Sequence, residues 1–289
     1  MRVSLPAVYS INQKRLSNEI RCLSVPAMQI EAEVPRYSHG KHSGYLIRSQ
    51  ALGHEVAVLK KAATYPADLR WIVVADVGEG FAELDLRSAH WARHPDIHAE
   101  PINYGQAFRQ TLTSWRDAFH YVPENPAERI VGLRPPQIGA IHAVHAHWAV
   151  SEGVATVVLP TGTGKTETML SLLITAAASK LLVVVPTDVL RTQLSDKFVS
   201  LGILKHPDSA VLNKSALTPI ICSLRHVPRT VEEVDQVFEV SHVIVTTSSI
   251  LSKATFAEHL RESASTRAGP WPSWVGPLLV CLFSCLGHR

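Results

Sequence analysis

The sequence has few cysteines and no long apolar run. Its four cysteines are too few and too scattered for a disulfide framework, which indicates a reducing compartment. The longest apolar stretch, at 275–287, is shorter than the roughly 20 residues of a membrane span. The N-terminus also lacks the apolar core of a signal peptide. We therefore expect a protein of the cytoplasm, or of the nucleoid or nucleus, that is neither secreted nor bound to a membrane.

Aromatic residues and net charge are also modest. Aromatic side chains make up 7% of the chain and are scattered, so they form no visible stacking platform for single-stranded nucleic acid. The formal net charge of +3 permits a nucleic-acid partner but does not argue for one. The hydrophobic content of 46% is typical of a globular chain, and 289 residues favour roughly two domains.

The N-terminal part of the chain gives weak signals. Residues 1–60 show no clear periodicity. The segment 70–87 is typical of a strand, a glycine-containing turn and a second strand, and 104–122 predicts an amphipathic helix. The turn-rich segment 123–129 is a candidate domain boundary.

From Arg134 onward, strand patterns alternate with helix patterns. The predicted strands are 154–159, 180–186, 217–224 and 241–248; the predicted helices begin at 135, 166, 188 and 231. This alternation favours an α/β fold with a mostly parallel, doubly wound sheet. Ligands bind such sheets at the carboxyl ends of the strands, and the polar stretches of this region follow predicted strands.

The polar stretch PTGTGKT, at 160–166, is typical of a phosphate-binding loop. Gly162 and Gly164 let the backbone approach phosphate oxygens, and the start of the next helix favours negative charge. Lys165 would reach the β and γ phosphates, while the Thr166 hydroxyl would bind Mg²⁺. The loop therefore predicts an ATP site.

The stretch LPTGTGKTE resembles motif I of superfamily-2 helicases of the DEAD/DEAH-box and restriction-subunit-like groups, which tolerate Leu159 in place of the first P-loop glycine. Three further segments extend the resemblance: LRPPQIGAI at 133–141, VVVPTDVLRTQ at 183–193 and VIVTTSSIL at 243–251. The resemblance implies a RecA-like P-loop lobe, ATP and Mg²⁺ as cofactors, and DNA or RNA as a partner held by its backbone.

The resemblance also implies roles for individual residues. The residues implied for nucleotide binding are Gln137, Thr161, Gly162, Thr163, Gly164, Lys165, Thr166 and Glu167. Those implied for nucleic-acid contact are Pro186, Thr187, Arg191, Thr246 and Thr247. Gln137 would bind adenine; the alternative is a surface residue on a helix. For the three threonines, capping of the following helix is an equal alternative.

Hydrolysis by a P-loop enzyme also needs a carboxylate for Mg²⁺ and a group that orients the attacking water. The resemblance implies an Asp-Glu pair after a later strand, but no aspartate or glutamate follows Glu262. Asp76 ends a predicted strand but precedes the loop in sequence. We therefore expect a helicase product truncated before this motif, with a divergent or altered-frame tail, and little hydrolysis.

The predicted organisation is an α+β or partly irregular region at 1–130, an incomplete helicase ATP-binding lobe at 131–262, and an atypical tail at 263–289. The predicted function is ATP binding by a nucleic-acid-dependent, helicase-like ATPase, with Lys165 and Thr166 as its catalytic residues. A non-catalytic nucleotide-binding or interaction module is the main alternative, and a small P-loop kinase is a third. Neither the oligomeric state nor the choice between DNA and RNA follows from the sequence.

Overall fold

A computed structural model describes residues 1–12, 18–87, 89–98, 103–151, 155–160, 162–176, 178–206, 208–253 and 278–282. The chain forms two compact units. Unit 1 consists of 1–11 and 23–100, and unit 2 consists of 12–22 and 101–289. None of the helices in the described part of the chain has the length and hydropathy of a membrane span.

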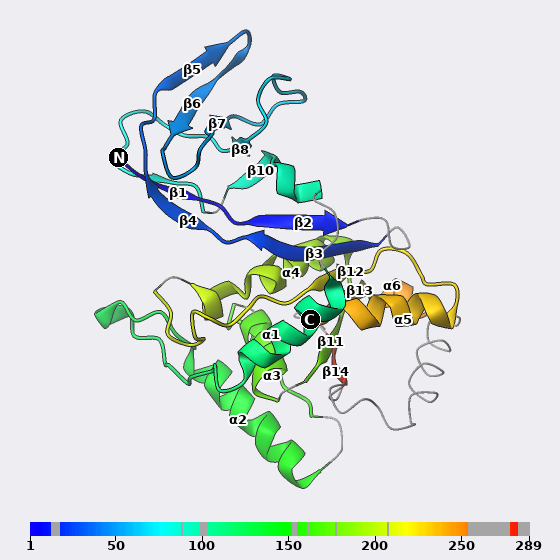
Figure 1. Cartoon of the computed structure of the whole chain (residues 1–289). Helices are drawn as coiled ribbons and strands as arrows, with labels where there is room; N and C mark the ends of the chain where they lie inside the picture. The colour runs from blue at the N-terminus through cyan, green and yellow to red at the C-terminus, as the bar shows by residue number, and fades with distance from the viewer. Residues whose placement is uncertain are drawn as a thin grey trace, which may run out of the picture. The chain divides into compact units, whose positions relative to one another are not determined.

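Unit 1 is made of short strands in two sheets (Figure 1). The smaller sheet has the order β4-β1-β9, with β1 at Arg2–Leu5, β4 at Met28–Glu31 and β9 at Leu84–Asp85. The larger sheet has the order β10-β8-β7-β6-β5 and contains β5 (Arg36–His39), β6 (His42–Arg48), β7 (Glu55–Leu59), β8 (Ile72–Val74) and β10 (His90–Arg93). A short 3-10 helix, η1 (Pro95–His98), follows β10.

One apolar core joins the two sheets of unit 1. Val3 of β1 packs in the same cluster as Ile47, Val58 and Val73 of the larger sheet. Gly44 of β6 is required for the close approach of β7, because a Cβ atom there would lie 2.0 Å from the carbonyl oxygen of Val58. Residues 1–60 show no clear periodicity in the sequence, and this core explains why: its strands are at most seven residues long, and none contributes more than two fully buried side chains to it.

Unit 2 contains a sheet of parallel strands. β11 (Lys180–Val185) lies between β13 (Val243–Thr247) and β14 (Leu278–Leu282), and β12 (Ile221–Ser223) lies on the far side of β13; all four run parallel. The full sheet order is β14-β11-β13-β12-β3-β2, where β2 is Val8–Asn12 and β3 is Glu19–Val25. Because β3 runs antiparallel to β12, the sheet is mixed. The mostly parallel, doubly wound arrangement that the sequence favours is seen only in part, as the parallel strands β14, β11, β13 and β12.

The start of β3 is fastened to the loop after β12. The amide oxygen of Asn18, which is 1% exposed, accepts hydrogen bonds from the backbone N–H groups of Arg225 (2.8 Å) and His226 (3.0 Å). The buried carboxylate of Glu19 pairs with the Arg225 guanidinium at 3.0 Å. Arg21 bridges Glu19 and Asp196. A segment from the N-terminal part of the chain is therefore integral to unit 2.

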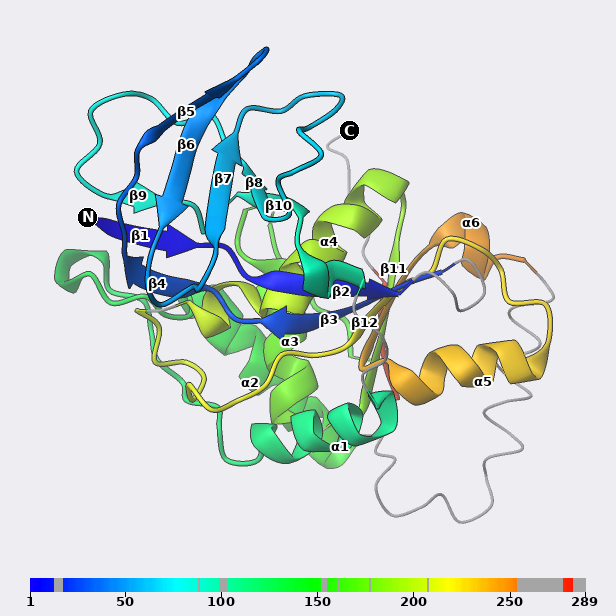
Figure 2. The ribbon, with the colours of Figure 1, turned by 45° about the horizontal axis from the view of Figure 1, so that its top comes forward.

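Helices lie on both sides of this sheet (Figure 2). On one side, α1 (Tyr104–Trp115) and α5 (Val231–Val240) pack against the apolar side chains of β11, β12 and β13. α4 (Asp188–Ser200) contacts β12 and β13, and also α3 (Lys165–Thr175), which in turn packs on α2 (Pro135–Val150). The short helices η2 (Pro126–Glu128), η3 (Gly202–Lys205) and α6 (Ser248–Leu251) complete the unit.

Buried polar side chains hold α1 in place. His242 is 0% exposed and stacks on Phe108 with ring centroids 4.1 Å apart. One ring nitrogen of His242 accepts from the N–H of Ile220 and the other donates to the carbonyl of Phe108, each at 3.0 Å. Burial, opposed in part by the hydrogen bond to the Phe108 carbonyl and aided by the charge of Lys180, lowers the pKa of His242 to about 3. The imidazole is therefore neutral in the folded protein.

Three local predictions differ from the structure. The predicted strand at 154–159 is wrong for its described part, because 155–159 form no strand and Val158 is 74% exposed. The predicted helix at 104–122 ends at Trp115, where the chain turns through Asp117 at φ 53°. The turn-rich segment 123–129 forms η2 inside unit 2. The helices α2, α4 and α5 and the strands β11, β12 and β13 form where the sequence predicts them.

Candidate nucleotide-binding site

The loop 160–164 has the backbone shape that its glycines predict. Gly162 and Gly164 adopt φ values of +84° and +86°, a left-handed conformation that side chains with a Cβ rarely adopt. A Cβ atom on Gly162 would meet nothing within 4 Å, so that side of the loop is open. α3 begins directly after Gly164, which places the loop at the N-terminus of a helix of 11 residues.

Hydrogen bonds within the loop use its carbonyl groups. The Lys165 ammonium donates to the carbonyl of Pro160 at 3.0 Å, and the Thr163 hydroxyl donates to the same oxygen at 2.7 Å. The Gly164 carbonyl accepts from the backbone N–H and the hydroxyl of Thr168. Thr161 lies outside the described residues.

Three backbone N–H groups in and after the loop remain available for an anion. Among the described residues, no acceptor binds the backbone N–H of Gly162, Gly164 or Thr166. The Thr166 side chain is 93% buried at the start of α3, and its hydroxyl has no described protein partner. Donors of this kind at a helix N-terminus favour a phosphate, and a hydroxyl oxygen is a suitable Mg²⁺ ligand. The residues present therefore fit a nucleotide phosphate with its metal ion.

Gln137 connects the start of α2 to the loop. It is 3% exposed, so it is not the surface residue that the sequence leaves as an alternative. Its side-chain oxygen accepts from the N–H of Arg134 at 2.7 Å, and its side-chain nitrogen donates to the carbonyl of Gly164 at 3.0 Å. An amide can accept two and donate two hydrogen bonds, so one of each stays free for a base edge. Contact with adenine stays a prediction.

Arg134 is a loop contact that the sequence analysis missed. Its guanidinium donates to the carbonyl of Gly162, and its Nε lies 3.5 Å from the carboxylate of Glu124. It precedes two prolines that begin α2, which fixes its backbone in an extended conformation beside the loop. The sequence signal was an arginine three residues before Gln137, but nothing in the spacing showed that it reaches the loop.

Glu167 lies beside the loop without pointing to open solvent. Its carboxylate is 14% exposed and lies 3.7 Å from the Lys197 ammonium of α4. The pair links α3 to α4, the helix that follows β11. A role of Glu167 in nucleotide binding stays a prediction, and the observed geometry gives it a structural one.

The residues predicted for nucleic-acid contact lie at the carboxyl ends of β11 and β13. Pro186 follows β11, and Thr187 is exposed and caps α4, since its hydroxyl accepts from the N–H of Leu190 at 3.3 Å. Arg191 is 5% exposed and its guanidinium donates to Asp188 at 2.7 Å. Pro186 and Thr187 are thus accessible to a partner, whereas the Arg191 side chain is not exposed.

The two threonines of β13 are buried. Thr246 is 0% exposed, and no described group bonds to its hydroxyl. Thr247 is 2% exposed, and its hydroxyl shares a hydrogen bond of 2.9 Å with Ser249. Neither side chain caps α6. The two hydroxyls therefore lie below the surface, and α6 begins directly after them at Ser248.

Strand register places the candidate groups at one edge of the sheet. Val184 and Val185 of β11 pair with Thr246 and Thr247 of β13, and Leu282 of β14 pairs with Val184. The carboxyl ends of the three parallel strands therefore meet where Thr187 begins α4. The residues that follow β14, FSCLGHR at 283–289, include no carboxylate in their sequence.

The glycine loop, the lysine and threonine at a helix start, and the parallel sheet define a P-loop nucleotide-binding unit. Residues 130–266 match the family described as the type III restriction enzyme res subunit, a helicase superfamily 2-like ATPase domain. The match covers less than half of the chain. No curated protein and no solved structure shows significant similarity to it.

Proposed function

We propose that unit 2 binds ATP with Mg²⁺ at the loop 160–166, as the nucleotide-binding lobe of a helicase-like, nucleic-acid-dependent ATPase. The left-handed Gly162 and Gly164 at the start of α3 carry this proposal, together with the backbone N–H groups of Gly162, Gly164 and Thr166, which no acceptor among the described residues binds. The family match over 130–266 supports a helicase-like ATPase in general. Its assignment to DEAD/DEAH-type motors, and unwinding or translocation as the parent activity, belong to the proposal.

Each residue of the loop has a distinct task. The Lys165 ammonium exchanges its hydrogen bond to the Pro160 carbonyl for one to a phosphate oxygen. The Thr166 hydroxyl holds the metal ion, which would neutralise phosphate charge. Gln137 and Arg134 bind the carbonyls of Gly164 and Gly162, so they fix the direction of the loop N–H groups.

We further propose that this chain hydrolyses ATP slowly. Efficient hydrolysis needs a carboxylate near the metal ion and an oriented water molecule. β14 lies next to β11, and its carboxyl end is at the sheet edge where such a group would be useful, but the sequence after it contains none. Of the acids near the loop, Glu167 is paired with Lys197, and Glu124 is paired with Arg134.

The same observation favours a second candidate, a non-catalytic nucleotide-binding module. The two candidates differ in what ATP does. The helicase-like lobe predicts that ATP changes the affinity for nucleic acid, and the non-catalytic module predicts no change. Filter binding of single-stranded and double-stranded oligonucleotides, with and without ATP, distinguishes them.

Binding of a fluorescent ATP analogue tests the site itself. We expect Lys165→Ala to weaken binding by about tenfold or more, because a charged hydrogen bond to phosphate is worth roughly 1.5–3 kcal/mol. Lys214→Ala is the matched control, since Lys214 is an exposed lysine of unit 2 outside the loop. Equal affinities of the wild type and Lys165→Ala would refute the site. Fast turnover that Lys165→Ala abolishes would refute the proposal of slow hydrolysis.

A further inference from the structure

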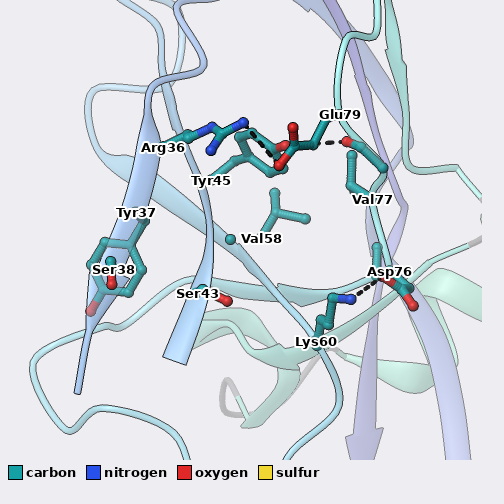
Figure 3. Close-up of a pocket in the computed structure, with 13 residues that line it drawn as sticks. Arg36, Tyr37, Ser38, Ser43, Tyr45, Val58, Lys60, Asp76, Val77 and Glu79 are labelled. Atoms are coloured by element: carbon teal, nitrogen blue, oxygen red, sulfur yellow. Dashed lines mark hydrogen bonds and ion pairs between the residues drawn. The ribbon is translucent and has the colours of Figure 1, made fainter. Parts of the chain in front are cut away.

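Unit 1 contains a cavity of about 540 Å³ on one face of its larger sheet (Figure 3). Strand register explains its lining. Arg36 of β5 pairs with Tyr45 of β6, which pairs with Val58 of β7, so these three side chains form a row across the sheet. Ser43 of β6 and Lys60, which directly follows β7, also line the cavity.

The acidic loop 75–79 borders this face. Asp76 pairs with Lys60 at 2.8 Å, and Glu79 pairs with Arg36 at 2.9 Å. The Tyr45 hydroxyl donates to the carbonyl of Gly78 at 3.1 Å. Figure 3 shows the two ion pairs at opposite ends of the cavity, with Val58 between them. The loop thus places one carboxylate on each of two cations that the sheet presents.

These contacts are easy to exchange. All four charged side chains are at least 66% exposed, and pairs of that kind contribute only about 0–1 kcal/mol each. The cations are fixed on or beside hydrogen-bonded strands. The carboxylates are on the loop 75–79, which contains Gly78 and is followed by Gly80 with φ at 75°. An anion that binds Arg36 and Lys60 therefore has to move only the loop that carries Glu79 and Asp76. A cation that bound Glu79 and Asp76 would have to move residues on or beside the sheet.

We propose that this face of unit 1 binds a single strand of nucleic acid, whose phosphates replace Asp76 and Glu79 beside Lys60 and Arg36. Two cations at the ends of an open cavity suit an extended polyanion. Tyr45 also lines the cavity and supplies an aromatic ring beside it, as single-strand sites do. The choice of nucleic acid, rather than another polyanion, rests on the proposed function of unit 2. The cavity and its two cations are observed independently of that function.

The acidic loop gives this site a built-in competitor. In the absence of a ligand, Asp76 and Glu79 occupy the positions that phosphates would take, so the wild-type protein binds weakly. Removing the loop charges therefore strengthens binding, whereas removing the sheet charges weakens it. A surface that only solvates its charges shows neither response.

Fluorescence anisotropy of the full chain with labelled oligothymidine and oligouridine, without ATP, tests the proposal. We expect the double variant Asp76→Asn/Glu79→Gln to bind about 3- to 10-fold more tightly than the wild type. The double variant Arg36→Ala/Lys60→Ala should bind more weakly by a similar factor. It should also lower the slope of log affinity against log salt concentration by about 1.4, because two phosphate contacts are lost. Lys61→Ala is the matched control, because Lys61 is an exposed neighbour of Lys60 that does not line the cavity. Photo-crosslinking to a peptide that contains Tyr45 locates the bound strand. Preference between the two oligomers separates DNA from RNA.

Three outcomes would overturn the proposal: equal affinities for the wild type and Asp76→Asn/Glu79→Gln, an effect of Arg36→Ala/Lys60→Ala no larger than that of Lys61→Ala, or polyglutamate that competes as well as the oligonucleotide. All substitutions are at exposed side chains, and circular dichroism checks that each variant is folded. Failure here leaves ATP binding at Lys165 unaffected, and the Lys165→Ala assay tests that separately.

Discussion

Alanine substitutions at Gly162 and Gly164 should have different costs, although both glycines have nearly the same φ. At Gly162 an added Cβ meets nothing within 4 Å, so the cost is the left-handed backbone alone, about 1–2 kcal/mol. At Gly164 the Cβ would lie 1.9 Å from the side-chain nitrogen of Gln137. Gln137 must then move, and it is the buried group that joins α2 to the loop.

The extra cost at Gly164 follows from the two hydrogen bonds of Gln137. Each contributes roughly 0.5–1.5 kcal/mol, so Gly164→Ala should destabilise the protein by about 2–5 kcal/mol in total. In a Gln137→Ala background that clash is absent, and the same substitution should cost only about 1–2 kcal/mol. The coupling between the two positions is therefore expected to be roughly 1–3 kcal/mol.

Urea denaturation followed by circular dichroism measures these differences, and hydrogen exchange at 133–141 reports on the start of α2. Gly162→Ala serves as the matched control for backbone strain. Equal losses of stability for Gly162→Ala and Gly164→Ala would refute the role assigned to Gln137. Additive costs of Gly164→Ala and Gln137→Ala would refute it as well.

Three further predictions concern other parts of unit 2. The pKa of His242 is about 3 in the folded protein and near 6.5 in the unfolded chain, so the unfolded state binds more protons between these pH values. The free energy of unfolding should therefore fall as the pH drops below about 6, by on the order of 1 kcal/mol per pH unit. Urea titrations at several pH values measure this slope, and His242→Phe should reduce it. Thr187→Ala removes the cap of α4 and should cost about 1 kcal/mol in thermal denaturation; nucleic-acid affinity that falls without this loss would instead favour a direct contact. Arg134→Ala should weaken ATP binding by a few-fold, because the Gly162 carbonyl loses its donor; an unchanged affinity would show that the loop keeps its shape without it.

Much of unit 2 was predictable from the sequence because its signals are local. The apolar run of β11 and the regular spacing of Ile138, Ile141 and Val144 on α2 each specify an element without reference to the rest of the chain. Thr187 at the start of α4 is likewise a local cap signal. The positive φ values of Gly162 and Gly164 follow from the same local logic.

The remaining features depend on contacts between distant residues. The spacing of residues in the sequence does not show that the Arg134 side chain reaches the Gly162 carbonyl. Nor does it show that the Thr246 side chain is fully buried at the end of β13. The apolar run at 154–159 has the composition of a strand, but no neighbouring strand pairs with its described part. In unit 1, β8 and β9 form within the segment 70–87, as the sequence predicts. Residues 1–60 were unpredictable for the same reason as Arg134, since their short strands form a core with strands distant in the sequence.

The antiparallel pairing of β3 with β12 has a consequence for how unit 2 can be isolated. A fragment that began at Pro101, or at the start of the family match, would lack Glu19 and Asn18. β12 would then present an open edge, and the N–H groups of Arg225 and His226 would lose their acceptor. Such a fragment should aggregate, and adding back a peptide spanning 12–25 should restore its solubility, as a missing strand does when supplied in trans.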